Sequence, residues 1–207
     1  YGLADPGIRG DLPVVDLCVV LARGGARTVQ IRWKAAGARE LLEAARAAKE
    51  ALRPFGVRLV VNDRPDVALL AGADGVHVGA EDLPVEEVRR LVGDALFVGA
   101  TVRDVEGARA AARAGADYVG FGPVFPTSSK VVDAAPRGLD ALKEVVRLSP
   151  VPVVAIAGIG LENIGQVAAT GAAAAAVGSA ALGRDGGTAA IAERARALVA
   201  AFHAGRS

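Results

Sequence analysis

Short apolar runs rich in β-branched residues alternate with longer amphipathic stretches throughout this chain of 207 residues, and this alternation constrains its fold more than any other feature. The runs lack the alternation of polar residues found in strands that face water. They are typical of parallel strands covered on both faces. The predicted strands are Tyr1–Ala4, Val29–Arg32, Val57–Val61, Gly75–Val78, Leu96–Ala100, Tyr118–Phe121, Val151–Ala157 and Ala173–Val177.

The stretches between these runs have the periodicity of helices. In Ala38–Leu52, the residues Leu41, Ala45 and Leu52 share one face, and the charged residues lie mostly elsewhere. Further helices are predicted over Val14–Leu21, Val105–Ala114, Leu139–Leu148, Leu161–Ala169 and Thr188–Phe202, and from near Pro65 and near Pro84.

Four related phrases end predicted helices just before strands: Ala22-Arg-Gly-Gly-Ala, Ala71-Gly-Ala-Asp, Ala114-Gly-Ala-Asp and Ala169-Thr-Gly-Ala. Glycine can adopt the left-handed conformation that terminates a helix. The recurrence of such phrases is the signature of an internal repeat.

Eight strand-helix units with no linker between them predict an α/β protein, a (β/α)₈ TIM barrel, that forms one domain over residues 1–207. An open doubly wound sheet is the alternative, but no Gly-x-Gly-x-x-Gly follows the first strand. Because the chain begins at Tyr1 and contains no Met, we expect residues upstream of the first strand, near 1–4, to be missing.

Composition excludes several classes of protein. A single cysteine, Cys18, allows no internal disulfide, which predicts a reducing compartment, the cytoplasm. A net charge of +1 is not that of a nucleic-acid-binding protein, and no segment is apolar enough to span a membrane. The expected partners are therefore small molecules, with a homo-oligomer left open.

Polar residues follow nearly every predicted strand, and in a barrel these positions converge on one rim, where catalytic groups cluster. They are Asp5, Gln30, Arg32, Lys34, Asn62, Asp63, His77, Asp82, Thr101, Thr127, Ser129 and Lys130. Glycine-rich turns follow the last two strands, at Gly158–Gly160 and at Gly178–Ser179. Such turns present backbone N–H groups to an anion, so they predict a phosphate site, although glycine also serves simply to make turns tight.

Two carboxylates on adjacent strands, Asp63 and Asp82, could hold one Mg²⁺. Each is equally suited to cap the helix that follows it. The positive charges of Arg32, Lys34 and Lys130 on the same rim favour a pyrophosphate held through Mg²⁺ and basic side chains.

Four further residues have mainly structural interpretations. His77 lies inside a strand, and a buried, hydrogen-bonded role is favoured over proton transfer. Cys18 is predicted to pack in the core. Trp33 and Phe125 could stack on a planar ring or simply cover the barrel mouth.

Taken together, the rim motifs resemble those of the thiamine-phosphate synthase family, in order along nearly the whole chain. The motifs are Gln30-Ile-Arg-Trp-Lys34, Asn62-Asp63-Arg64, Gly75-Val-His-Val-Gly79 with Glu81-Asp82, Gly122-Pro-Val-Phe-Pro-Thr127 with Ser129-Lys130, Ala157-Gly-Ile159 and Val177-Gly-Ser179. The resemblance implies a Mg²⁺-dependent transferase of thiamine biosynthesis. Such an enzyme takes 4-amino-2-methyl-5-hydroxymethylpyrimidine pyrophosphate as a substrate. It joins the pyrimidine group to thiazole phosphate and releases pyrophosphate.

The resemblance also implies roles for individual residues. The pyrimidine pyrophosphate is expected to bind to Gln30, Arg32, Lys34, Asn62, Thr101 and Lys130. Of these, Arg32, Lys34, Thr101 and Lys130 are expected to be catalytic. The metal is expected at Asp63 and Asp82, and the thiazole phosphate at Thr127, Ser129, Gly158, Gly178 and Ser179.

The chain departs from the family pattern at Trp33, where an acidic residue is usual, and at Ala80, where Gln is usual. A sister family, the thiazole tautomerases, shares the barrel but generally lacks the two metal carboxylates and carries a His in the sixth loop. Asp63, Asp82 and Pro123 favour the synthase. A non-catalytic regulator that senses a thiamine precursor is a third hypothesis, for which no DNA-binding appendage is evident.

Overall fold

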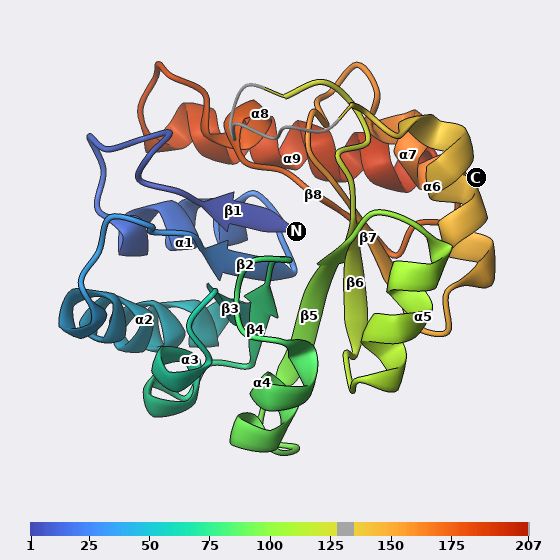
Figure 1. Cartoon of the computed structure of the whole chain (residues 1–207). Helices are drawn as coiled ribbons and strands as arrows, with labels where there is room; N and C mark the ends of the chain where they lie inside the picture. Colours follow the sequence, from blue (N-terminus) through green and yellow to red (C-terminus); the bar gives the residue numbers. More distant parts are fainter. Residues whose placement is uncertain (128–134, 207) are drawn as a thin grey trace.

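A computed structural model describes residues 1–127 and 135–206 and shows eight parallel strands in the order β1 to β8 (Figure 1). The strands are β1 Gly2–Ala4, β2 Thr28–Ile31, β3 Arg58–Asn62, β4 Gly75–Val78, β5 Phe97–Val102, β6 Tyr118–Phe121, β7 Val153–Ile156 and β8 Ala174–Ala176. A parallel bridge between Gly2 and Val177 joins the first strand to the chain just after the last. The predicted (β/α)₈ barrel is confirmed.

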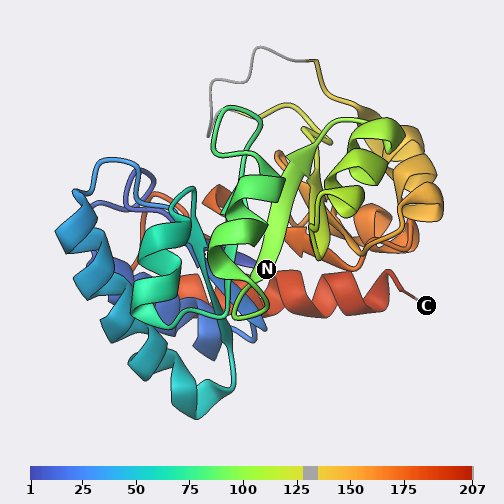
Figure 2. The same cartoon turned by 60° about the horizontal axis from the view of Figure 1, so that its bottom comes forward.

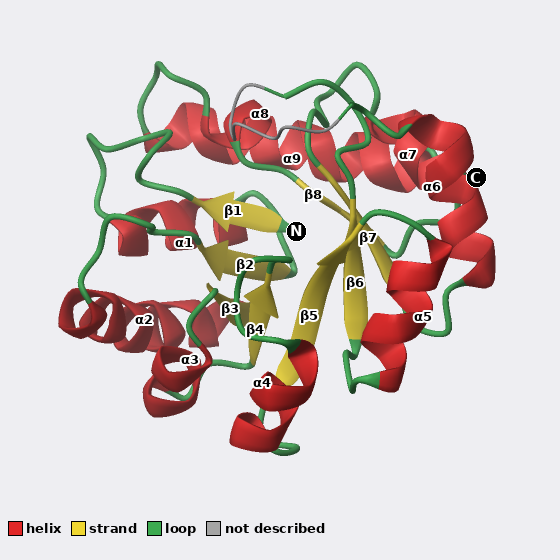
Figure 3. Ribbon diagram, in the orientation of Figure 1, coloured by secondary structure: helices red, strands yellow, loops and turns green. Residues whose placement is uncertain are grey.

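Helices surround the sheet (Figure 3). They are α1 Val14–Arg23, α2 Ala38–Leu52 with the 3₁₀ turn η1 Arg53–Phe55, α3 Pro65–Ala71, α4 Val85–Val92, α5 Val105–Arg113, α6 Gly138–Leu148, α7 Ile164–Ala169, α8 Ser179–Leu182 and α9 Thr188–Ala204. Helix α9 packs against α1, α7 and α8, and the last helix thereby lies beside the first (Figure 2). Among the described residues, no helix is long and apolar enough to cross a membrane.

The segment after β7 differs from the prediction. Strand β7 ends at Ile156 because Ala157 and Gly158 have φ values of 73° and 67°, outside the range of a strand. Helix α7 begins at Ile164 rather than at Leu161. Asn163 accounts for the difference, because its Oδ1 accepts from the Gly160 N–H at 2.9 Å and its Nδ2 donates to the Gly158 carbonyl at 3.0 Å.

The recurring glycine phrases end helices as predicted. Each contains one glycine with positive φ, namely 91° at Gly25, 64° at Gly72, 100° at Gly115 and 85° at Gly171. A side chain at such a position would strain the backbone. The repeat in the sequence is therefore a repeated helix-to-strand turn on one face of the barrel.

The apolar residues form two cores. The larger core lies between sheet and helices and includes Cys18, whose complete burial confirms the prediction and raises the pKa of its thiol. The smaller core contains Tyr118, Val154 and Ala176, packed against partly buried residues such as Phe97. These residues come from alternate positions of neighbouring strands, as expected for side chains that fill a barrel interior.

Glycines make room for the large rings of the smaller core. A Cβ added to Gly99 would lie 2.0 Å from Cζ of Tyr118, its partner on the adjacent strand. A Cβ added to Gly75 would lie 2.4 Å from Cε2 of Phe97, again the cross-strand partner. The pairing of glycine with an aromatic ring is thus a packing requirement of the interior.

Candidate active site

The first cation of the rim, Arg32, is anchored by a carboxylate. Its Nη1 donates to Oδ2 of Asp5 at 2.5 Å. Asp5 is buried, and its Oδ1 accepts from the Gly7 N–H at 2.8 Å. Arg32 therefore follows β2 in a set orientation, and within residues 1–127 and 135–206 its other N–H groups have no hydrogen-bond partner and can donate to an anion. The sequence placed Asp5 on the rim but assigned it no partner.

The two predicted metal ligands lie close enough to interact. Lys34 Nζ lies 2.5 Å from Oδ2 of Asp63. Desolvation by burial raises the pKa of Asp63, Lys34 opposes this shift, and the neighbouring Asp82 carboxylate adds to it. The two acidic groups thus face one another at the ends of β3 and β4, with a cation beside them.

Capping, the alternative interpretation of these two carboxylates, is wrong. The residues at the N-caps of α3 and α4 are Arg64 and Pro84, and neither helix has a side-chain cap. Asp63 itself adopts a left-handed conformation with φ 63°. Oδ2 of Asp82 accepts from the Gly79 N–H at 2.7 Å, within its own loop.

The donor set fits Mg²⁺. Mg²⁺ typically takes one or two protein carboxylates and completes its octahedral shell with water and phosphate oxygens. Within residues 1–127 and 135–206, no group of three or more His, Cys, Asp and Glu side chains could hold a metal ion. The two carboxylates of Asp63 and Asp82 are hard oxygen ligands of the kind that Mg²⁺ accepts.

Gln30, Asn62 and Thr101 lie on β2, β3 and β5, on the same end of the barrel as the two cations. Gln30 is buried, and its Nε2 donates to the Tyr1 hydroxyl at 2.8 Å. Thr101 Oγ1 lies 2.9 Å from Nε2 of His77, which is buried as predicted. Both polar side chains are therefore held by groups inside the barrel.

The two glycine turns follow neighbouring, paired strands. Gly158 lies two residues after the end of β7, and a Cβ added there would lie 2.5 Å from the Pro126 carbonyl oxygen, so the backbone of the sixth loop passes directly against it. Gly178 is the N-cap of α8, and Ser179 is its first residue. The two turns therefore follow adjacent strands of the barrel, and binding of phosphate there stays a prediction. Thr127 is the last residue described before the gap, and the predicted residues Ser129 and Lys130 lie outside the described residues.

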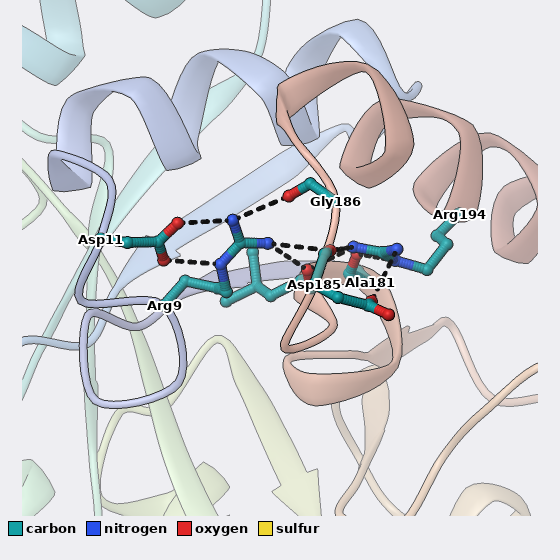
Figure 4. A network of polar contacts seen from close by, with 7 residues as sticks. Arg9, Asp11, Ala181, Asp185, Gly186 and Arg194 are labelled. Atoms are coloured by element: carbon teal, nitrogen blue, oxygen red, sulfur yellow. Dashed lines mark hydrogen bonds and ion pairs between the residues drawn. The ribbon is translucent and has the colours of Figure 1, made fainter.

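A network of arginines holds the far end of α8 (Figure 4). The buried Arg9 donates to both carboxylate oxygens of Asp11, at 2.7 and 2.8 Å, and to the carbonyls of Leu182, Asp185 and Gly186. Arg194 of α9 donates to the carbonyls of Ala181, Leu182 and Asp185. Arg9 thus connects the loop after β1 to the segment after β8, and Arg194 connects α9 to the same segment.

The structure also places Phe125 and the two departures from the family pattern, Trp33 and Ala80. Trp33 and Phe125 are partly buried and pack against the larger core, and Ala80 is exposed in the loop after β4. Sequence reasoning did not single out Tyr1, Tyr118, Arg9 or Asn163. The one signal that the sequence offers for them is a side chain able to form hydrogen bonds, within a predicted strand for Tyr1 and Tyr118, within a loop for Arg9 and near the start of a predicted helix for Asn163.

The fold and the rim together define the class of the protein, a (β/α)₈-barrel enzyme whose charged and polar side chains gather at the carboxyl ends of the strands. A sequence profile described as thiamine monophosphate synthase matches residues 1–181. Thiamine-phosphate synthases of Myxococcus xanthus and Methanoculleus marisnigri are 54% and 45% identical over 207 residues, with all of this chain covered and 93% and 98% of theirs. The chain belongs to the thiamine monophosphate synthase family, and it is a transferase.

Solved structures agree with this assignment. Thiamine phosphate pyrophosphorylase from Pyrococcus furiosus superimposes with a TM-score of 0.87 at 33% identity, covering 100% of this chain and 96% of that one. A structure described as native KDPGal, at 21% identity, has a TM-score of 0.74 and covers 99% of this chain and 94% of that one. At that identity the second likeness shows the fold alone.

Proposed function

We propose that this chain transfers the hydroxymethylpyrimidine group from its pyrophosphate to thiazole phosphate, in a Mg²⁺-dependent reaction that yields thiamine phosphate and pyrophosphate. The observation that carries the proposal is the pair of facing carboxylates, Asp63 and Asp82, with Lys34 at 2.5 Å from Asp63. A site that accumulates charge of both signs suits a leaving pyrophosphate, whose negative charge grows as it departs. The names of the relatives support the same activity.

In the proposed reaction, the bond between the pyrimidine methylene carbon and the pyrophosphate oxygen breaks, and the electron pair leaves with the pyrophosphate. The lone pair of the thiazole nitrogen then forms the new carbon–nitrogen bond. Arg32, Lys34 and Lys130 bind the leaving group, and Gln30, Asn62 and Thr101 bind the pyrimidine end. When bound at Asp63 and Asp82, Mg²⁺ supplies further neutralisation of the pyrophosphate charge.

The thiazole phosphate is assigned to the opposite side of the rim, at Thr127, Ser129, Gly158, Gly178 and Ser179. Two features support this assignment: the close approach of the backbone at Gly158, and the position of Gly178 before α8. Because no protein nucleophile is required, the chain needs only to hold two substrates in line and stabilise charge.

The test is release of pyrophosphate from purified protein supplied with both substrates, with and without Mg²⁺. We expect turnover that is abolished by a chelator and restored by added Mg²⁺. Turnover of thiazole phosphate alone, unaffected by the chelator, would instead identify a tautomerase. Absence of pyrophosphate release in the presence of Mg²⁺ would refute the proposed function.

A further inference from the structure

A continuous chain of hydrogen bonds crosses the barrel interior beneath the rim. Gln30 Nε2 lies 2.8 Å from the Tyr1 hydroxyl, which lies 3.0 Å from the Tyr118 hydroxyl. The Tyr118 hydroxyl lies 2.9 Å from Nδ1 of His77, and Nε2 of His77 lies 2.9 Å from Oγ1 of Thr101. These hydrogen bonds thus join Gln30 and Thr101, which are assigned to the pyrimidine substrate. The three residues between them, Tyr1, Tyr118 and His77, have no role in the proposed reaction.

Because these side chains are buried, each polar group needs its neighbour in the series as a hydrogen-bond partner. The exposed fractions of Gln30, Tyr118 and His77 are 4%, 8% and 9%. Buried polar groups that lose their partner bear the cost of desolvation without compensation. Burial also raises the pKa of both tyrosine hydroxyls, so each keeps the single proton that it can donate.

One direction through this hydrogen-bond chain begins at Gln30, whose amide nitrogen can only donate. Gln30 donates to the Tyr1 hydroxyl, and either tyrosine hydroxyl can donate to the other; in this direction Tyr1 donates to Tyr118. In the same direction Tyr118 donates to Nδ1 of His77, which requires the neutral tautomer that carries its hydrogen on Nε2. That hydrogen is donated to Thr101 Oγ1, so the hydroxyl proton of Thr101 is free to bind a substrate acceptor.

We infer that the interior chain of Tyr1, Tyr118 and His77 sets the hydrogen-bonding polarity of the substrate site, so that Thr101 is a donor and the Gln30 carbonyl an acceptor. This inference rests on the proposed function for the identity of the substrate. An aminopyrimidine has acceptor ring nitrogens beside a donor amino group, and therefore matches this pattern. The corresponding oxopyrimidine carries a donor N–H beside an acceptor oxygen, and is disfavoured by it.

Tyr118 and His77 are positioning residues in this scheme, because they act on the substrate through Thr101. Tyr118→Phe removes one hydroxyl from the middle of the chain and retains the ring. We expect the KM for the pyrimidine pyrophosphate to rise about tenfold, with an unchanged KM for thiazole phosphate. Discrimination between the 4-amino substrate and its 4-oxo analogue should fall in the same variant.

A matched control is Val154→Ala, which removes carbon atoms from the same interior cluster but no hydrogen bond. Its melting temperature should fall while both KM values and the discrimination stay at the level of the wild type. If Val154→Ala reproduced the effects of Tyr118→Phe, loss of packing would explain them and the inference would be wrong.

A second measurement does not depend on the substrate. The chain has only two histidines, and the other, His203, is exposed, so ¹⁵N nuclear magnetic resonance can resolve the imidazole of His77. We expect the Nε2–H tautomer in the wild type and a mixture of tautomers in Tyr118→Phe.

An Nδ1–H tautomer or an imidazolium in the wild type would overturn the assigned polarity, even in an active synthase. An Nε2–H tautomer with unchanged KM and discrimination in Tyr118→Phe would overturn the role in specificity. A wild type that shows the expected tautomer but no pyrophosphate release would count against the proposed function instead.

Discussion

Substitution of Gly99 by Ala tests whether the barrel interior is as tightly packed as its glycines indicate. The new Cβ would lie 2.0 Å from Cζ of Tyr118, whereas ordinary contact begins at 3.4 Å, so the ring must move by about 1.4 Å. The Tyr118 hydroxyl is held at 3.0 Å from Tyr1 and 2.9 Å from His77, and a shift of this size breaks both hydrogen bonds.

The expected cost follows from these two effects. Overpacking of a core typically costs about 1–3 kcal/mol, and two lost hydrogen bonds add about 1 kcal/mol each. We therefore expect the free energy of unfolding to fall by about 3–5 kcal/mol, which for a domain of this size lowers the melting temperature by about 6–20 °C. Urea denaturation followed by circular dichroism measures this difference.

Two controls separate packing from other effects of the added methyl group. Nothing lies within 4 Å of a Cβ added to Gly37, so Gly37→Ala should leave stability nearly unchanged. In a Tyr118→Ala background, Gly99→Ala should cost little, because the ring that it meets is absent. A Gly99→Ala variant within about 0.5 kcal/mol of the wild type would refute the reasoning.

Three further predictions concern the rim. Asp63→Asn should abolish most of the activity yet stabilise the metal-free protein at pH 7, because the raised pKa of Asp63 means that its ionised form destabilises the fold. Urea denaturation measures this gain in stability. The gain should vanish as pH falls through the pKa of Asp63 in the folded protein towards the ordinary value of 3.8. Asp63→Ala should be less stable than Asp63→Asn by about 1 kcal/mol, because φ is 63° and Asn tolerates that conformation better; equal melting temperatures would contradict this. Arg9→Met should lower the melting temperature and raise the KM for thiazole phosphate more than that for the pyrimidine pyrophosphate, since Arg9 holds the carbonyls at the end of α8.

Local patterns in the sequence were sufficient to predict the barrel. Ala38–Leu52 was predicted with the bounds that helix α2 has, because its periodicity repeats over several turns. The helix-ending glycines were equally clear, since positive φ at Gly72 or Gly115 is a property of one residue and its neighbours. Ala157 and residues 161–163 were assigned to the wrong elements, because the positive φ at Ala157 and the Asn163 turn interrupt both periodicities; the turn predicted at Gly158–Gly160 lies between them.

The sequence by itself determined which chemical groups stand on the rim, because strand ends in a barrel converge whatever the details of packing. Only the tertiary structure decided how those groups are held. The Arg32–Asp5 pair joins residues 27 positions apart, and the hydrogen bond from Arg9 to the Leu182 carbonyl spans 173 positions. The interior chain from Gln30 to Thr101 requires the register of several strands at once, as well as the space that Gly99 leaves for Tyr118. Such contacts depend on distances set by the closed barrel, and no periodicity in the chain encodes them.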